Sequence, residues 1–466
     1  MWQYDTKVIG NGKLVKRGLW LPWVAMFCIF LATHALNAEE LFPVPKSLET
    51  NVDFWTKIFA QYSSNHVVIH DRDDLSVIYD VVNLNEFYPD SVDMRTKWDA
   101  VDEIKDRYRD ILRELAALPH PIAVDSLTND QFHVYVLWST HENPDKFSRA
   151  VYNIRGQLGL RDRFAESIKR SGYYFRDIQT IFRSHGLPIE LCYLPHVESL
   201  FHYNIYSKVG AAGLWQFIYR TGRLYMTIDA AVDERLDPLY ASEAAARFLK
   251  GNYEELGSWP MAITAYNHGL NGMKTAKQRL GTTDFDIIVR EYKSRSFGFA
   301  SKNFYAEFLA AIHVAQNYNA YFGALQPYQP KSYQLVELPE SYYLRQLAEK
   351  FDVPSDTLIA YNPAFRRAAQ QNWRRIPSGY RLRLPYREGY DPREVFVQAT
   401  APARYQKYQP PVQPPDLLTL ASTASADSVA SQEDMTKPQH ERGLSQPANR
   451  GESDVFESPP ASMQTN

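Results

Sequence analysis

The sequence predicts a mainly α-helical protein of several domains. Apolar residues recur at helical spacing over residues 99–118, 241–257 and 301–318, and most of 187–320 shows the same pattern. The alternation that is typical of strands is limited to short segments such as 67–71. At 466 residues the chain is too long for one ordinary hydrophobic core, so we expect two or three domains.

Residues 1–38 are predicted to be a signal peptide or an N-terminal anchor. Basic residues precede an apolar run at about 19–32, and small residues follow it, which is the order of a secretory leader. The run is shorter than the ~20 residues of a membrane span. Leu36 is a poor residue at the third position before a cut after Ala38, so the anchor stays an open alternative.

Cysteine content and charge indicate the environment of the protein. Only Cys28 and Cys192 are present, and removal of the leader would leave no intrachain disulfide. Cys192 is expected to be a small buried residue. An exported protein without disulfides is compatible with a bacterial periplasm. The formal net charge is -3, and proteins that bind nucleic acid are usually basic. No nucleic-acid partner is therefore predicted.

Residues 39–186 are expected to form a mainly helical N-terminal region. Short strands are predicted within it at 67–71 and 75–82, where apolar and polar residues alternate. The region contains no motif that suggests chemistry. We therefore expect it to pack against the domain that follows.

The segment 187–217 is the most informative part of the chain. Gly186 can end one helix, and Pro188 suits the start of the next. An apolar helical pattern then covers 189–201, and Glu198 lies within it. A carboxyl group in such a helix has either a partner or a raised pKa, because burial disfavours the charged form. A raised pKa is what a general acid requires at neutral pH.

A second carboxylate, which most glycosidases use, is not evident. Glu190 precedes Glu198 by eight residues, which is ~12 Å along a helix and too far for one scissile bond. Glu190 in a first helical turn would simply complement the helix dipole. Asp229, Asp233 and Glu234 lie in a polar loop and could supply a second carboxylate, but we expect solvated charges there.

No metal or other cofactor is predicted. His196 and His202 flank Glu198, but their spacing places only His202 on the same side of a helix as Glu198. No third ligand is near in the sequence, whereas a metal site needs at least three protein ligands.

Three segments together resemble successive motifs of the family 1 lytic transglycosylases. They are LPIELCYLPHVES (187–199), GAAGLWQF (210–217) and AYNHG (265–269), in the family's order within ~80 residues. The closest resemblance is to the membrane-bound lytic murein transglycosylase D group. It implies a goose-lysozyme-like helical catalytic (SLT) domain, which we expect at 187–325, followed by a linker at 326–331.

The resemblance implies that one carboxylic acid performs the chemistry. Glu198 would protonate the glycosidic oxygen between N-acetylmuramic acid and N-acetylglucosamine, while the substrate's own N-acetyl group stabilises the positive charge. The same carboxylate would then accept the proton of the C6 hydroxyl, which closes on C1 and leaves a 1,6-anhydro end. The enzyme would be a carbon–oxygen lyase acting on a polysaccharide, with no cofactor.

The first two motifs imply further substrate-binding residues. Ser199 matches a serine that helps to hold the substrate or the acid; without the resemblance it would be a mid-helix serine bonded to a backbone carbonyl. Gln216 matches a glutamine whose amide can both donate to and accept from an acetamido group. Gly210 and Gly213 would let the backbone approach the sugar closely.

The third motif and the helix after it complete the predicted site. Tyr266 matches the tyrosine that reaches the acid or the N-acetyl group, and Asn267 matches a substrate-binding asparagine. Without the resemblance, they would be a core tyrosine and a helix cap. Tyr305 lies where the family has an Asn-Tyr pair that lines the cleft, here interrupted by Phe304.

Residues 332–386 resemble a LysM module, a small βααβ carbohydrate-binding fold. The resemblance implies glycan binding, although Pro339-Glu340-Ser341 replaces the family's Gly-Asp-Thr and residues 365–375 are an insert. From residue 405 to 466 the chain is rich in Pro, Ser, Ala and acidic residues and has few aromatics, so we expect a disordered tail.

Together these features predict a lytic transglycosylase in the periplasm of a Gram-negative bacterium. It would be a monomer that acts on peptidoglycan strands, with association to the inner or outer membrane left open. Two alternatives remain. A goose-type lysozyme would use water and yield reducing ends, and a non-catalytic scaffold would bind peptidoglycan without cleaving it. The intact residues in all three motifs argue against the scaffold.

Overall fold

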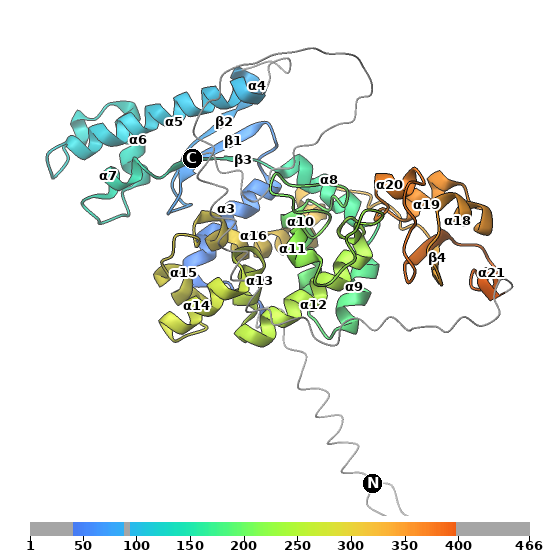
Figure 1. The fold of residues 1–466 in the computed structure, drawn as a ribbon. Helices are drawn as coiled ribbons and strands as arrows, with labels where there is room; N and C mark the ends of the chain where they lie inside the picture. Colours follow the sequence, from blue (N-terminus) through green and yellow to red (C-terminus); the bar gives the residue numbers. More distant parts are fainter. Residues whose placement is uncertain (1–40, 88–93, 398–466) are drawn as a thin grey trace, which may run out of the picture. The chain divides into compact units, whose positions relative to one another are not determined.

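The structure is a computed structural model that describes residues 41–87 and 94–397. Within these residues, helices are the commonest elements, beside two small antiparallel sheets, so the mainly α fold is confirmed (Figure 1). Residues 44–397 belong to one compact unit. None of the described helices has the length and apolar character to cross a membrane. The predicted leader and tail lie outside the described residues.

The N-terminal region combines a three-stranded sheet with helices. Its elements are α3 (Glu49–Ala60), β1 (His66–Asp71), β2 (Ile78–Asn83), α4 (Leu84–Phe87), α5 (Met94–Ala117), α6 (Asn129–Leu137), α7 (Lys146–Ala150), β3 (Ile154–Leu158), α8 (Arg161–Ser171) and α9 (Phe175–Ser184). The central strand β1 pairs antiparallel with β2 and β3, and the two predicted strands are confirmed as β1 and β2. The strand β3 was not predicted, because Arg155, Gly156 and Gln157 interrupt its apolar alternation.

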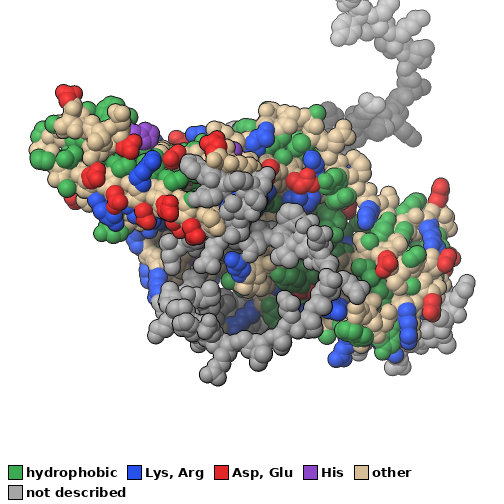
Figure 2. Space-filling view, turned by 90° about the horizontal axis from the view of Figure 1, so that it is seen from above, with side chains coloured by type: hydrophobic (Ala, Val, Ile, Leu, Met, Phe, Trp, Pro, Cys, Tyr) green, Lys and Arg blue, Asp and Glu red, His purple; other side chains and the backbone are tan. Residues whose placement is uncertain are grey.

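Helix α5 covers this sheet with its apolar face. Val101, Leu112 and Leu115 of α5 are buried in the same core as Val67 and Ile69 of β1. Its solvent face carries interspersed acidic and basic side chains, seen at the left of Figure 2. Ion pairs between Lys105 and Asp102 and between Arg113 and Asp110 join residues three positions apart. The amphipathic helix predicted over 99–118 is therefore present and begins one turn earlier.

The region that follows is helical and contains the three motifs. Its elements are the 3-10 helix η3 (Ile189–Tyr193), α10 (Leu194–Glu198), α11 (Tyr219–Gly222), η4 (Glu234–Leu236), α12 (Pro238–Leu256), α13 (Trp259–His268), α14 (Leu270–Leu280), α15 (Phe285–Glu291), α16 (Phe299–Gln316) and α17 (Tyr318–Phe322). The helices predicted at 241–257 and 301–318 are α12 and α16. Gly257 ends α12 in the left-handed conformation, at a φ of 73°.

Helix α10 is shorter than the apolar pattern predicted. The pattern continues to Phe201, but Leu200 and Phe201 have φ values of 50° and 58°, so the backbone leaves the helix after Glu198. The backbone N–H of Phe201 instead donates to the carbonyl of Pro195, at 3.1 Å. The apolar spacing correctly predicted that both residues are buried, but it wrongly predicted that they are helical.

The N-terminal region packs against α16 through α3. Phe54 and Ile58 of α3 share a core with Ala306 and Ala310 of α16, whose small side chains allow close approach (Figure 1). The side-chain oxygen of Asn303 on α16 accepts a hydrogen bond from Asn51 Nδ2 (2.8 Å) and from Trp55 Nε1 (3.2 Å). Helix α16 is thus buried on this side by residues far earlier in the chain.

The C-terminal module (residues 332–386) has the predicted order of strand, helix, helix and strand. Its elements are β4 (Tyr333–Glu337), α18 (Leu344–Phe351), α19 (Ser355–Tyr361), α20 (Arg367–Gln370) and β5 (Arg381–Pro385), followed by α21 (Glu394–Val397). The strands β4 and β5 pair antiparallel. The short helix α20 lies in the segment 365–375, which the sequence marked as an insert.

Candidate active site

Glu198 is the last residue of α10 and lies where α10, α13 and α16 meet. It is half-buried, and its carboxyl group interacts electrostatically with Tyr266 on α13 and Glu307 on α16. Burial raises the pKa of Glu198 to about 8. Among the described residues it forms no ion pair. Of the two alternatives, a charged partner or a raised pKa, the structure favours the raised pKa, and the acid form predominates at pH 7.

Ser199, directly after the acid, caps α10 and does not lie mid-helix. Its hydroxyl donates to the carbonyl of Leu214 (2.8 Å) and lies 3.3 Å from the carbonyl of Pro195. Both acceptors belong to the backbone, and the side chain is buried. In this structure Ser199 therefore holds residues 210–217, here called the motif loop, beside Glu198.

Gln216 lies in the motif loop in a strained conformation. Its φ of 48° is in the left-handed region, which a residue with a side chain rarely adopts. Its side-chain nitrogen donates to the carbonyl of Gly213 at 2.8 Å, so the loop itself orients the amide. This bond uses one N–H and leaves the second N–H able to donate and the amide oxygen able to accept.

Arg235 is a site-supporting residue that the sequence analysis missed. Its Nη1 donates to the carbonyls of Gly210 and Phe217, both at 3.0 Å, at the two ends of the motif loop. Tyr266 holds the middle of the loop, because its hydroxyl donates to the carbonyl of Trp215 at 2.8 Å. Arginine in a polar loop gives no local signal for this role, since both acceptors lie about 20 residues earlier in the sequence.

Gly213 is needed for a close contact within the protein. A Cβ at this position would lie 1.7 Å from the carbonyl oxygen of Arg235, and the φ of Gly213 is 77°. Gly210 has a similar φ of 79°, but no atom would lie within 4 Å of its Cβ. The contact with Arg235 therefore explains the need for glycine at position 213, whereas approach of either glycine to a sugar stays a prediction.

The other two predicted residues differ in their exposure. Asn267 is exposed at the end of α13, and its side-chain oxygen accepts a hydrogen bond from Ser301 of α16 at 3.0 Å. Tyr305 is 0% exposed, and its ring packs edge-on against Phe285. The prediction that Tyr305 lines the cleft is wrong. The additional residue Phe304 turns the tyrosine by about 100° around the helix, into the core.

Glu307 on α16 is a second carboxyl group at the site that the sequence analysis missed. It is 5% exposed, and burial together with the neighbouring Glu198 raises its pKa to about 8. It lies in a helix of apolar residues, which is the same signal that identified Glu198. Two interacting carboxyl groups lose their protons in two steps that belong to the pair. At pH 7 both are mainly neutral.

The remaining acidic candidates are occupied by structural bonds. Asp233 and Glu234 are buried, so the expectation of solvated charges is wrong for them. Arg235 donates to both oxygens of Asp233, at 3.0 and 2.8 Å. Asp229 accepts hydrogen bonds from two backbone N–H groups of its own turn. Glu190 lies in the first turn of η3, as expected.

The histidines beside Glu198 are uncharged. His196 is buried, its Nδ1 is 2.8 Å from Ser167 Oγ, and burial lowers its pKa to about 3. Burial and the nearby Arg170 lower the pKa of His202 to about 4. In residues 41–87 and 94–397, no three His, Cys, Asp or Glu side chains are grouped as metal ligands. Cys192 is buried, as expected.

Replacing Gly213 by alanine should destabilise the protein far more than replacing Gly210. The left-handed conformation alone costs an alanine about 1 kcal/mol, which we expect for Gly210→Ala. Gly213→Ala adds the clash with the Arg235 carbonyl and should cost about 3 kcal/mol or more. Urea unfolding of both variants measures the difference. Equal losses would contradict the assigned contact.

Glu307→Gln should flatten the pH dependence of stability. The pKa of Glu307 is raised from 4.5 to about 8, so its contribution to stability is present at low pH and is lost as pH rises toward 8. Between pH 6 and 8 the wild type should lose about 2 kcal/mol more unfolding free energy than the variant. Urea unfolding across this range tests it, with Glu254→Gln on exposed α12 surface as the control. Parallel curves would refute the assignment.

Comparison with known proteins relates the part of the chain that contains Glu198 to one domain family. Residues 179–289 match the transglycosylase SLT domain. Membrane-bound lytic murein transglycosylase D of Escherichia coli (strain K12) is 36% identical over 109 residues, which are 22% of this chain and 24% of that protein. A protein of Alteromonas sp. (strain M-1) that is named for tributyltin chloride resistance is 33% identical over 102 residues, 22% of this chain and 49% of that protein.

These matches span between a quarter and a half of the length of the relatives. The matched domain begins within α9, before the predicted boundary at residue 187, and ends within α15. It contains Glu198 and all three motifs, whereas Glu307 lies beyond its end. Residues 179–289 of this chain are thus similar to the transglycosylase SLT domain.

Proposed function

We propose that this protein is a peptidoglycan lytic transglycosylase. It cleaves the β-1,4 bond between N-acetylmuramic acid and N-acetylglucosamine and leaves 1,6-anhydro-N-acetylmuramic acid ends. The observation that carries the proposal is a half-buried carboxyl group, Glu198, protonated at neutral pH inside a transglycosylase SLT domain. The relative from Escherichia coli, which is named a lytic murein transglycosylase, supports it.

Glu198 performs both proton transfers in this proposal. With a pKa of about 8 it is protonated at neutral pH, and it is acidic enough to donate to a departing glycosidic oxygen. The resulting carboxylate lies in a site of low polarity, so it regains a proton readily from the C6 hydroxyl of the same sugar. Gln216 and Asn267 bind the substrate, and the Tyr266 hydroxyl keeps the motif loop next to the acid.

The surroundings of Glu198 favour one acting carboxyl group over the two of a lysozyme that uses water. Asp229 and Asp233 are engaged in structural hydrogen bonds. Glu307 has a pKa of about 8 and is mainly protonated at pH 7, so it does not accept a proton from water there. A non-catalytic scaffold would have no need for a protonated carboxyl group at this place.

The name of the Escherichia coli relative refers to a membrane-bound murein enzyme, which supports a place in the cell envelope. We place this protein in the periplasm of a Gram-negative bacterium, with residues 1–38 as its signal peptide or anchor. It acts as a monomer on peptidoglycan strands. The C-terminal module is LysM-like and binds glycan.

Glu198→Gln should abolish cleavage and leave the fold intact. The amide resembles the neutral acid in shape but cannot donate a proton to the glycosidic oxygen, so we expect a loss of at least about 10³-fold. Mass spectrometry of the soluble fragments released from purified peptidoglycan measures it. Wild-type fragments should be lighter by one water than hydrolytic muropeptides.

Glu190→Gln, in the first turn of η3, is the matched control and should retain activity. Fragments of full hydrolytic mass would indicate a lysozyme. Binding to insoluble peptidoglycan without release of fragments would indicate a scaffold. Wild-type turnover by Glu198→Gln would exclude Glu198 as the acid.

A further inference from the structure

The C-terminal module is joined to the catalytic region by paired backbones. The segment 229–235, here called the bridging segment, runs antiparallel to the start of the module's insert. The N–H of Asp233 donates to the carbonyl of Ala364 at 2.8 Å, and the N–H of Arg366 donates to the carbonyl of Ala231 at 2.9 Å. The guanidinium of Arg366 also donates to the carbonyl of Asp229, at 2.8 Å.

Apolar burial accompanies this pairing. Val232 and Phe365 face each other in an antiparallel bridge, and both are buried. Val232 belongs to the same hydrophobic core as Leu358 and Leu382 of the module. The module's core is therefore completed by a residue of the catalytic region, and separation of the two would expose apolar surface.

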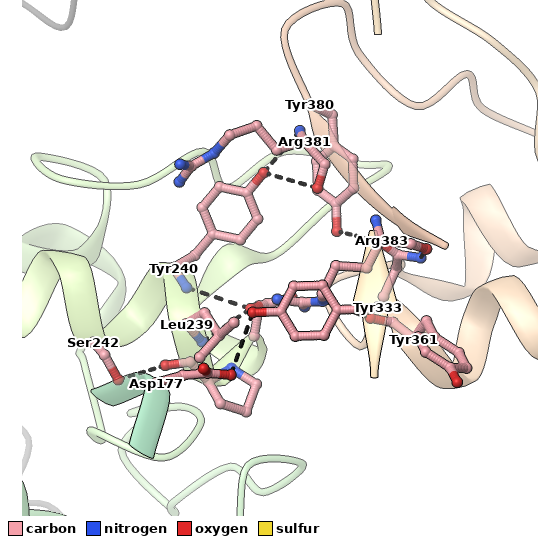
Figure 3. Close-up of polar contacts among 12 residues, drawn as sticks. Asp177, Leu239, Tyr240, Ser242, Tyr333, Tyr361, Tyr380, Arg381 and Arg383 are labelled. Atoms are coloured by element: carbon pink, nitrogen blue, oxygen red, sulfur yellow. Dashed lines mark hydrogen bonds and ion pairs between the residues drawn. The ribbon is translucent and has the colours of Figure 1, made fainter. Parts of the chain in front are cut away.

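An ion pair and a hydrogen bond also join the module to the start of α12 (Figure 3). Arg383 of β5 forms an ion pair with Asp237, the residue that caps α12, and both side chains are buried. Figure 3 shows Tyr240 of α12 beside Arg381 of β5. The hydroxyl of Tyr240 on α12 accepts a hydrogen bond from the backbone N–H of Arg381 at 2.8 Å. A module that served only to tether the enzyme would need no such contacts.

The other end of the bridging segment reaches the site. Arg235 is 5% exposed, and it is oriented by its two hydrogen bonds to Asp233, which is 1% exposed. The same guanidinium donates to the carbonyls at both ends of the motif loop. A buried, bidentate pair has one preferred geometry, so a shift of Asp233 moves Arg235 with it.

We propose that the C-terminal module is a positioning element of the active site. Its residues 364–366 fix the bridging segment, and Arg235 of that segment fixes the motif loop that carries Gln216. The role of Gln216 in binding substrate rests on the proposed function, whereas the coupling between module and loop does not.

Arg366→Pro tests the coupling in the full-length protein. The φ of Arg366 is -77°, which proline adopts, so the module's own backbone should tolerate the change. Proline removes the N–H that donates to Ala231 and the side chain that donates to Asp229. The matched control is Arg367→Pro. Arg367 is the first residue of α20, where proline is favoured and no helical hydrogen bond is lost.

Hydrogen–deuterium exchange without substrate is the first measurement. The N–H groups of Ala212, Gly213 and Gln216 are hydrogen-bonded within or next to the motif loop. We expect them to exchange about tenfold faster in Arg366→Pro and at the wild-type rate in Arg367→Pro. Faster exchange confined to the bridging segment, or no change in either segment, would overturn the proposal.

Kinetics on soluble peptidoglycan fragments is the second measurement. Arg366→Pro should raise KM by about threefold or more, because the amide of Gln216 is no longer held. A variant that merely lowers the folded fraction would reduce the apparent kcat and keep KM, which would count against positioning. If Arg366→Pro does not fold, Arg366→Ala removes only the bond to Asp229 and should show smaller changes in the same direction. Faster loop exchange in a protein that releases no anhydro products would refute the proposed function and leave the coupling intact.

Discussion

The backbone carbonyls of the motif loop are the acceptors on which the rest of the site depends. Leu214 accepts from Ser199, Trp215 accepts from Tyr266, and Phe217 accepts from Arg235. The donors come from three separate segments of the chain. Phe217 also accepts from the N–H of Ala212 within the loop, whereas the carbonyls of Leu214 and Trp215 accept from side chains of other segments, because a buried carbonyl without a donor is costly.

The same arrangement removes water from the neighbourhood of Glu198. Buried side chains from α10 and α16 leave the carboxyl group few polar contacts, so the neutral form is favoured. The cost falls on stability, since two carboxyl groups that stay neutral when folded would be ionised in the unfolded chain at pH 7. The site is thus a place where the protein gives up stability for a particular protonation state.

Local sequence patterns identified those features that depend on neighbours along the chain. The apolar surroundings of Glu198 indicated either a partner or a raised pKa, and the alternation at residues 67–71 predicted β1. The end of α10 was misjudged, because the left-handed Leu200 and Phe201 are as apolar as helical residues would be. Arg235 was not recognised, because its acceptors are distant in sequence.

The family resemblance predicted the wrong position for one residue of α16. It transferred a tyrosine to position 305 by proximity in sequence, but one added residue on a helix changes the direction of a side chain. Glu307, two positions later, shows that the same helix does contribute a polar group to the site. Glu307 lies among apolar residues of its helix as Glu198 does, so the same pattern indicates a buried carboxyl group at both positions.

The packing of α3 on α16 limits how the matched domain can be separated from the rest of the chain. The segment that matches the SLT domain begins at residue 179, yet the small apolar face of α16 is covered by Phe54 and Ile58. Excised at the boundaries of the match, residues 179–289 would lack α16, and adding α16 alone would leave its apolar face without the cover that α3 provides. Residues 179–289 are therefore not expected to fold independently in this chain. Their transfer to another protein would have to include α16 and the helix at 49–60.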